Sequence, residues 1–308
     1  MHFAIRFWLF LSLIGLAACS APPTQDDMDA SQAKPFDWQG HRGARGLLPE
    51  NTVPAFLKAL EYPQVKTLEL DLAVSQDSQL VVSHEPWMSH HICSHPDGRP
   101  VTEAEEDELL IFQMPYDSVR QYDCGSRGNA RFPQQQAQPA YKPLLREVVQ
   151  EADAFAKQQE RALPRYNIEI KLEPDYDGVK APAPQTFARL LLEEIKALDI
   201  TERSTVQSFD VRPLQRLHRM DSSITTALLI DNPNGVAVNL QALGYTPEIY
   251  SPYYKMVTAN VVKTVHDRGM KIIPWTVNDT TAMKALIELG VDGIITDYPD
   301  RIRDVIKR

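Results

Sequence analysis

One short stretch of the sequence carries the residue types that phosphate chemistry uses. His41-Arg42-Gly43 is followed, after a short loop, by Pro49-Glu50-Asn51-Thr52. Asn51 or Thr52 can cap a helix that begins near Val53, with a proline tolerated in its first turn. The free N–H groups of that helix would then lie near an imidazole and a guanidinium, and phosphate sites combine these groups. Helix caps are common, so the same residues are also compatible with a purely structural turn.

Two predicted strands carry carboxylates on one face and aliphatic side chains on the other. Residues 66–74 place Glu69 and Asp71 opposite leucines, and residues 165–172 place Glu169 opposite isoleucines. On an edge strand such carboxylates would face water. Inside a barrel, an unpaired buried charge costs on the order of several kcal/mol, so these side chains would need a cation. Because the pattern recurs on a second strand, we favour a metal site.

From residue 36 onward, short apolar segments alternate with longer helical patterns. This alternation is typical of βαβ units and a parallel sheet. We expect a first strand that ends at residues 41–43 and further strands at 66–74, 80–83, 165–172, 205–209, 224–230, 247–251, 271–277 and 293–296. Helices are expected from near residue 53 and at 144–162, 187–198, 211–220, 257–268 and 281–289. These are nine strand candidates for the eight positions of a barrel, and residues 247–251 are the weakest.

The amino terminus has the features of an export signal. An apolar run at residues 7–16 is too short to span a bilayer, which takes about 20 residues. It leads into Leu16-Ala17-Ala18-Cys19, which looks like a bacterial lipoprotein signal cleaved before a lipidated cysteine. Residues 1–18 would be removed, Cys19 lipidated, and residues 19–36 would form a flexible tether. The protein would then lie in the cell envelope, anchored on the periplasmic side of a membrane or at the cell surface. A plain secretory signal with an incidental cysteine is the alternative.

A long insertion, at about residues 86–142, separates the third strand from the next helix. It exceeds what a barrel loop needs, and we expect a small subdomain over one end of the barrel. With Cys19 lipidated, Cys93 and Cys124 are the remaining cysteines of an exported chain, so they are predicted to form a disulfide. The nearby His90, His91 and His95 lack the second ligand pair of a structural zinc site, which favours a solvated loop.

The charge balance limits the choice of partner. The 308-residue chain has 32 basic and 41 acidic residues, a net charge of -9, and no basic run stands out. Nucleic acid is therefore excluded as the expected partner. A phosphate substrate would have to be received locally, by a few arginines, lysines or a metal.

The order of these motifs resembles the glycerophosphodiester phosphodiesterase family. The matching motifs, from His41 to about Pro299, are His-Arg-Gly with Pro-Glu-Asn-Thr, Glu69-x-Asp71, His84, Glu169-x-Lys171, Gln207-Ser208-Phe209, Trp275-Thr276-Val277-Asn278 and Gly293-Ile294-Ile295-Thr296-Asp297. The resemblance implies an α/β fold, a TIM (β/α)8 barrel over residues 37–308, with the inserted subdomain after the third strand. The family usually has Asp after the second histidine, and here Glu85 follows His84.

The resemblance also implies the roles of the site residues in a metal-dependent hydrolysis of glycerophosphodiesters to glycerol 3-phosphate and an alcohol. Glu69, Asp71 and Glu169 would bind one divalent cation, Ca²⁺ or Mg²⁺, with Glu50 as a further candidate ligand. Arg42 and Lys171 would hold phosphate oxygens, and His41 and His84 would act as general acid and base. Trp275 would form an apolar wall for the glycerol.

Two other functions stay open. One is a non-catalytic surface lipoprotein that binds phosphodiesters. The presence of both histidines, His41 and His84, is evidence against this function. The other is a phospholipase or lyase of the same superfamily, which acts on intact lipid or stops at a cyclic phosphate; the polar composition of the insertion speaks against it. In the favoured interpretation the partners are small-molecule glycerophosphodiesters, and the membrane is contacted only through the lipid anchor. The sequence does not address the oligomeric state.

Overall fold

The computed structural model describes residue 2 and residues 36–306. The predicted signal peptide, Cys19 and the tether up to residue 35 lie outside the described residues. Within the described part of the chain, no helix is both long enough and apolar enough to cross a membrane.

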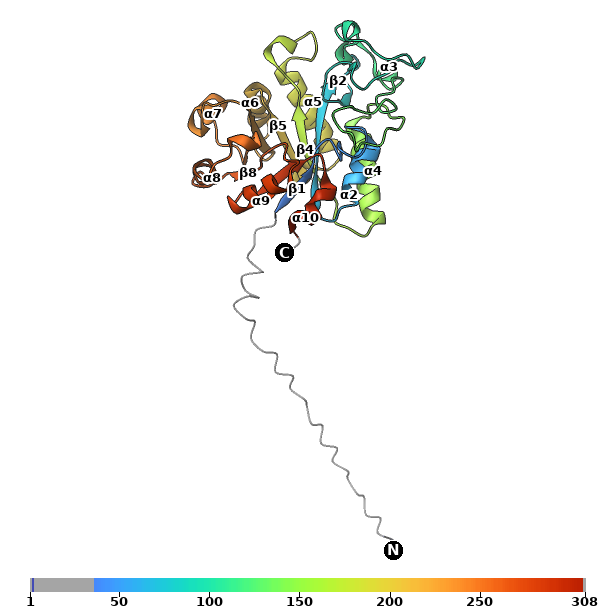
Figure 1. Cartoon of the computed structure of the whole chain (residues 1–308). Coiled ribbons are helices and arrows are strands. Elements are labelled where there is room, and N and C mark those ends of the chain that lie inside the picture. The colour runs from blue at the N-terminus through green and yellow to red at the C-terminus, as the bar shows by residue number, and fades with distance from the viewer. Residues whose placement is uncertain (1, 3–35, 307–308) are drawn as a thin grey trace. The chain divides into compact units, whose positions relative to one another are not determined.

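A parallel sheet forms the centre of residues 36–306 (Figure 1). Its eight parallel strands, in the order β8-β7-β6-β5-β4-β2-β1-β9, are β1 (Asp37–Gly40), β2 (Val65–Val74), β4 (Arg165–Ile170), β5 (Ser204–Ser208), β6 (Thr225–Ile230), β7 (Ile249–Pro252), β8 (Lys271–Ile272) and β9 (Gly293–Thr296). The two ends of the sheet meet, because Asp292 N donates to Ile272 O at 2.9 Å and Ile295 N to Pro274 O at 3.0 Å. The fold is therefore the expected TIM barrel.

The additional strand, β3 (Leu80–Val82), lies outside the barrel. It pairs antiparallel with the last residues of β2, with Leu72 opposite Val82. β2 is ten residues long, so its end extends beyond the barrel and turns back through Ser78, whose φ is 61°. The prediction that residues 247–251 are the weakest strand candidate is wrong, because β7 pairs with β6 on one side and β8 on the other. Both β3 and β7 are short apolar segments beside a turn, so their sequence patterns do not show which of them belongs to the barrel.

Helices cover the outside of the barrel (Figure 1). They are α2 (Val53–Leu60), α4 (Leu145–Gln158), α5 (Pro184–Ala197), α6 (Val211–Met220), α7 (Val236–Leu243), α8 (Ala259–His266), α9 (Thr280–Glu288) and α10 (Ile302–Ile306). Their apolar faces pack on the outward leucines of β2 and isoleucines of β4, which are fully buried. α2 begins at Val53 as predicted, and Thr52 caps it by accepting from Ala55 N at 3.4 Å. We did not predict α7.

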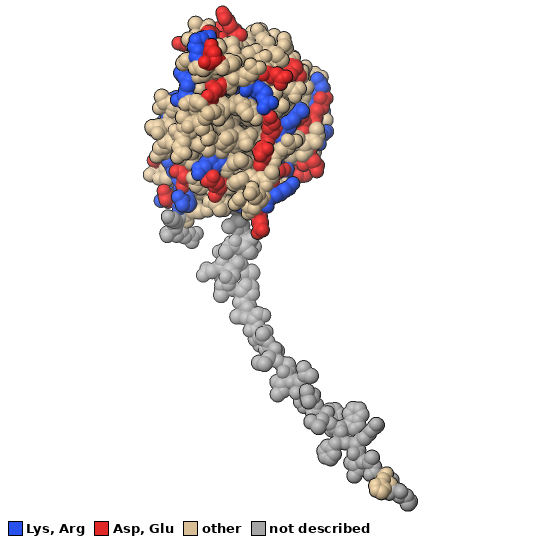
Figure 2. All heavy atoms as spheres, turned by 90° about the vertical axis from the view of Figure 1, so that its right-hand side faces the viewer, with Lys and Arg blue, Asp and Glu red and all other residues tan. Residues whose placement is uncertain are grey.

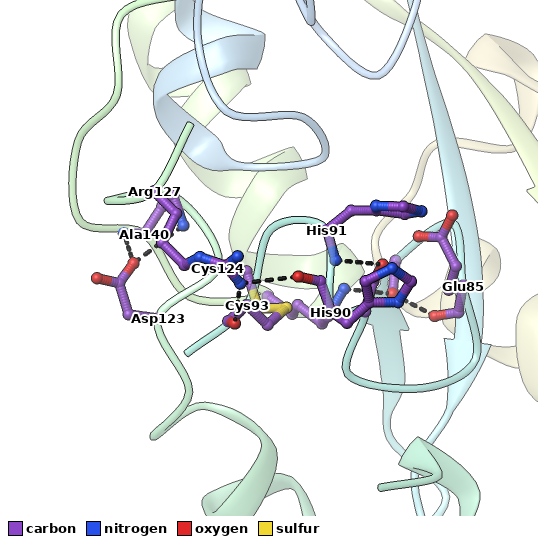
Figure 3. Close-up of a disulfide and its surroundings, with 12 residues drawn as sticks. Glu85, His90, His91, Cys93, Asp123, Cys124, Arg127 and Ala140 are labelled. Atoms are coloured by element: carbon purple, nitrogen blue, oxygen red, sulfur yellow. Dashed lines mark hydrogen bonds between the residues drawn. A yellow bond between two sulfur atoms is a disulfide. The ribbon is translucent and has the colours of Figure 1, made fainter. Parts of the chain in front are cut away.

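Residues 86–142 pack around a small apolar cluster, in which Met88, Ile111 and Val119 of the segment meet Ala73 of β2 and Val81 of β3. The segment contains α3 (Tyr116–Val119) and a disulfide between Cys93 and Cys124 (Figure 3). Arg127 Nη1 donates to the carbonyl oxygens of His90 and Cys93 at 2.8 and 2.9 Å. In Figure 1 this segment lies at the end of the barrel away from the start of β1.

Two of the three histidines of this segment, His90 and His95, pair with glutamates. His90 Nδ1 lies 2.7 Å from Glu106 Oε1, and His95 Nε2 lies 3.4 Å from Glu105 Oε1.

On the face shown in Figure 2, acidic and basic side chains are interleaved and separated by uncharged ones. Exposed ion pairs in such a mixture each contribute about 0–1 kcal/mol, so they keep the surface soluble more than they stabilise the fold.

Candidate active site

A cavity of about 260 Å³ opens among residues at and beyond the carboxyl ends of the barrel strands. It is lined by His41, Arg42, Arg45, Glu69, His84, Arg131, Glu169, Lys171, Gln207, Phe209, Leu229, Trp275, Thr276 and Ile295. Seven of the residues predicted from the sequence are in this lining. The other two predicted site residues, Asp71 and Glu50, contact Arg42 from behind it. Cys19 lies outside the described residues.

Three carboxylates meet on one side of the cavity. Glu69 and Asp71 come from β2, and Glu169 comes from the neighbouring strand β4, where it stands in register with Asp71. One oxygen of each lies within 4.8 Å of the others. The three side chains alternate with the outward aliphatics, so the strand geometry alone turns them inward.

The electrostatics of this group fit a divalent cation. All three carboxylates are buried, and Asp71 Oδ1 has no hydrogen-bond partner among residues 36–306. Burial, together with the neighbouring carboxylates, raises the pKa of Glu69 well above its usual range. Burial raises the pKa of Glu169 to about 7, although Lys171 opposes the shift. Hard oxygen ligands of this kind suit Ca²⁺ or Mg²⁺, and a cation would favour the ionised forms.

Arg42 links this group to the loop after β1. Its backbone N–H donates to Glu69 Oε2 at 2.9 Å, its Nη1 donates to Glu50 Oε1 at 2.6 Å, and its Nε lies 3.2 Å from Asp71 Oδ2. Glu50 is therefore an ion-pair partner of Arg42 and is not a member of the group of three. Arg42 adopts a left-handed backbone conformation with φ of 48°, followed by Gly43 at 81°. A Cβ atom at Gly43 would meet the backbone of Ala55 at 2.5 Å, so only glycine fits this turn.

His41 is held from its far side by Asp297. The distance from His41 Nδ1 to Asp297 Oδ1 is 2.7 Å, and the other ring nitrogen, Nε2, lies 3.9 Å from Glu69 Oε2. Burial, with the positive charge of Arg45, lowers the pKa of His41 to about 4. The imidazole is therefore neutral at neutral pH. With Nδ1–H assigned as the donor to Asp297, Nε2 is free to accept a proton on the cavity side.

His84 is held in the same way by its neighbour in sequence. Its Nδ1 lies 2.8 Å from Glu85 Oε1, and its Nε2 lies 3.1 Å from Lys171 Nζ. Lys171 Nζ in turn lies 2.9 Å from Glu169 Oε1. Burial and the charge of Arg42 lower the pKa of His84. The glutamate that stands where the family usually has aspartate thus still reaches the imidazole.

Sequence reasoning assigned no role to several polar residues that support the site. Asp297 also accepts from Arg45 Nε and from Asn278 Nδ2, each at 2.7 Å. Gln207 Nε2 donates to Glu69 Oε1 at 2.7 Å. Asp297, Asn278 and Gln207 belong to the recognised motifs, which was the available signal; Gln207 lies on β5, Asp297 just after β9, and Asn278 in the loop between β8 and α9. Arg45 and Arg131 had not been picked out by any role or motif in the sequence.

A model of the glycerophosphoryl diester phosphodiesterase family matches residues 41–301. The chain belongs to this family. It is 29% identical over 276 residues to a glycerophosphodiester phosphodiesterase of Bacillus altitudinis, which covers 87% of this chain and 98% of that protein. A lysophospholipase D of Rattus norvegicus is 23% identical and covers 86% of this chain and 84% of its own length.

Solved structures of similar proteins share the fold of this phosphodiesterase. A Silicibacter pomeroyi DSS-3 protein assigned to the same family has a TM-score of 0.77 at 27% identity, covering 89% of this chain and 94% of that chain. An Oleispira antarctica phosphodiesterase, solved in complex with the product sn-glycerol-3-phosphate, has a TM-score of 0.68 at 21% identity. The match covers 88% of this chain and 96% of that chain.

The phosphodiesterase also has an apolar wall in its cavity. Trp275 is fixed by its indole N–H, which donates to Ser251 O at 2.9 Å. Phe209 stands edge-on to Trp275, with ring centroids 5.3 Å apart, and is 41% exposed. This wall can cover carbon atoms of a substrate while the charged groups hold its phosphate.

Proposed function

We propose that this phosphodiesterase hydrolyses glycerophosphodiesters to glycerol 3-phosphate and an alcohol, with one divalent cation, Ca²⁺ or Mg²⁺, bound by Glu69, Asp71 and Glu169. The observation that carries the proposal is the cluster of three buried carboxylates beside two histidines whose Nδ1 atoms each contact a carboxylate. The product bound in the Oleispira antarctica structure supports the proposed product.

In this proposal a bound cation and two basic side chains hold the phosphate of the substrate. A bound cation would neutralise a phosphate oxygen and stabilise the charge that develops on phosphorus. Arg42 and Lys171, which line the cavity beside the carboxylates, would hold the remaining phosphate oxygens. Trp275 and Phe209 would cover the carbon atoms of the glycerol.

Two proton transfers are needed, and each histidine is suited to one. His41 Nε2 would accept the proton of the substrate's free glycerol hydroxyl, which then attacks phosphorus and forms a cyclic phosphate. Lys171 Nζ lies 3.1 Å from His84 Nε2, and this pair would protonate the leaving alcohol. Water then opens the ring, so that the overall reaction consumes one water and yields a phosphate monoester and an alcohol.

The test is a panel of substrates followed by phosphorus NMR. Glycerophosphocholine, glycerophosphoethanolamine and a lysophospholipid would be incubated with purified protein, with and without Ca²⁺ or Mg²⁺. We expect metal-dependent release of glycerol 3-phosphate from the first two. A lasting cyclic phosphate would instead indicate a lyase. Hydrolysis of the lysophospholipid alone, with release of acylglycerol 3-phosphate and the head-group alcohol, would indicate a lysophospholipase D, the activity after which the Rattus norvegicus relative is named. Binding without turnover would indicate a non-catalytic protein.

We also propose that the mature protein is anchored in the bacterial cell envelope by lipid on Cys19. The support is the apolar run followed by Leu16-Ala17-Ala18-Cys19, together with two cysteines placed to form a disulfide in an oxidising compartment.

A further inference from the structure

Arg131 reaches the cavity from the inserted segment, although it is far in sequence from every other residue of the lining. It stands on the loop of residues 129–136, which the barrel holds in place. Gln135 Nε2 donates to Arg45 O at 2.7 Å, and Gln136 N donates to Leu47 O at 2.8 Å. The next residue, Phe132, is buried with the guanidinium of Arg45 4.6 Å from its ring centroid. The position of Arg131 is therefore built by both parts of the fold.

Arg131 differs from the other basic side chains of the cavity in its pairing. Among the described residues, three of the four lysines and arginines in the lining pair with carboxylates: Arg42 with Glu50 at 2.6 Å, Arg45 with Asp297 at 2.7 Å, and Lys171 with Glu169 at 2.9 Å. The guanidinium of Arg131 has no carboxylate partner within residues 36–306. Its positive charge is free for a ligand.

Arg131 also lies at a different depth. His41, Arg42 and Glu69 are buried, whereas Arg131 is exposed. A phosphate that reacts between His41 and His84 would sit against the buried groups. A guanidinium at the open rim would meet the part of the substrate that extends outward, which is its alcohol portion or head group.

We propose that Arg131 is a specificity-determining residue that binds a second anionic group, carboxylate or phosphate, on the alcohol portion of the substrate. This inference rests on the proposed function and narrows its substrate class. Preferred substrates would be glycerophosphodiesters whose head group carries an additional negative charge. The planar fork of an arginine suits either anion, because both present two oxygens to it.

Two commercially accessible substrates differ by the group in question. Glycerophosphoserine is glycerophosphoethanolamine with one added carboxylate. We would measure kcat/KM for both with the full mature chain, as wild type, Arg131→Gln and Arg131→Lys. Exposed charge pairs contribute up to about 1 kcal/mol, which corresponds to about a five-fold change. We expect wild type to prefer glycerophosphoserine, Arg131→Gln to lose about five-fold on it and less than two-fold on glycerophosphoethanolamine, and Arg131→Lys to recover part of the loss.

The matched control is Arg120→Gln. Arg120 is exposed on the same segment but is not part of the cavity lining, so this variant removes the same charge elsewhere. It should leave the ratio between the two substrates unchanged. For both substrates, calorimetric binding to His41→Ala, with and without Arg131→Gln, gives a readout that does not depend on turnover.

Failure of the inference can be told apart from failure of the proposed function. Equal losses on both substrates in Arg131→Gln would assign Arg131 to the reacting phosphate and overturn the inference, and so would a wild-type preference for glycerophosphoethanolamine. Absence of hydrolysis of any glycerophosphodiester would overturn the proposed function. In that case the carboxylate-dependent difference in binding still decides whether Arg131 recognises a second anion.

Discussion

His41 Nδ1 lies 2.7 Å from Asp297 Oδ1, although the two residues are 256 positions apart in the chain. The contact joins the loop after the first barrel strand, β1, to the loop after the last one, β9, and these two strands pair side by side in the sheet. Asp297 is 1% exposed, and burial alone would raise its pKa, but the neighbouring His41 and Arg45 hold the pKa of this carboxyl well below its usual range. The pairing of β1 with β9 thus also orients the proposed base.

Replacing Asp297 by asparagine should remove the charge that orients the His41 ring while it keeps the size of the side chain at position 297. The amide keeps the size of the side chain but loses the charge that selects the Nδ1–H tautomer of His41. We expect kcat to fall by about 10²–10⁴-fold with little change in metal affinity. Steady-state kinetics and metal calorimetry would measure the two effects. Asp304→Asn, on the exposed face of α10, is the control, and equal kcat in both variants would show that Asp297 does not orient the base.

Removing the imidazole of His41 should affect the chemistry and spare the metal. In His41→Ala we expect kcat to fall by about 10²–10⁴-fold, because a general base is lost. Metal affinity should stay nearly unchanged, since His41 Nε2 is 3.9 Å from Glu69 and outside the group of three carboxylates. His266→Ala, which alters an exposed imidazole far from the cavity lining, is the control. A His41→Ala protein with wild-type turnover would move the chemistry elsewhere.

The sequence predicted the parts of the site that local periodicity determines. Alternation along two strands was sufficient to turn Glu69, Asp71 and Glu169 to one side, and parallel register then brings Asp71 opposite Glu169. The helix start at Val53 followed from its capping residues. In these cases each position depends on neighbours within a few residues, so a single sequence contains the information.

Other features depend on long-range geometry. The pairing of His41 with Asp297 exists because β1 and β9, the first and last strands of the chain, lie side by side in the barrel. The place of Arg131 depends on the path of a loop that is fixed by hydrogen bonds from Gln135 Nε2 and Gln136 N to backbone carbonyls of the loop after β1, and no local sequence pattern predicts these bonds. The short apolar strands β3 and β7 could not be ranked for a similar reason, since the pairing partner decides which of them joins the barrel.

The disulfide should stabilise the inserted segment. It links residues 31 apart in sequence, which in the chain-entropy model corresponds to about 3–4 kcal/mol. We expect Cys93→Ser with Cys124→Ser to be cleaved faster by protease within residues 86–142, while the barrel resists. Denatured, unreduced wild type should show no free thiol from this pair. Two titratable thiols in mature protein purified from the envelope would contradict the bond.

Cys19 should carry the membrane anchor. Cells given a tagged fatty acid should label the wild-type chain, and Cys19→Ser should escape labelling and appear in the soluble fraction. Ser20→Ala is the matched control and should label like wild type. Equal labelling of wild type and Cys19→Ser would support the plain secretory signal instead.

Metal binding should release protons, and more of them at low pH. In the folded, metal-free protein the pKa of Glu69 is raised well above its usual range and that of Glu169 to about 7. Glu169 therefore holds a proton below about pH 7, and the raised pKa of Glu69 acts in the same direction, whereas a cation needs both carboxyls ionised. His41, with a pKa of about 4, stays neutral and does not contribute in this range. Affinity for Ca²⁺ or Mg²⁺ should therefore rise as the pH rises through the pKa of Glu169.

Calorimetry in two buffers with different ionisation enthalpies counts the protons directly. We expect about one or more protons released per cation near pH 6 and fewer near pH 9, where Glu169 is already ionised. Glu169→Gln should bind the cation more weakly and release fewer protons near pH 6, because the replaced side chain cannot titrate. Glu193→Gln, on an exposed position of α5, should behave like wild type. Equal proton release at both pH values would mean that the cation binds without displacing protons from these carboxylates, and chelation that leaves hydrolysis intact would remove the cation from the reaction.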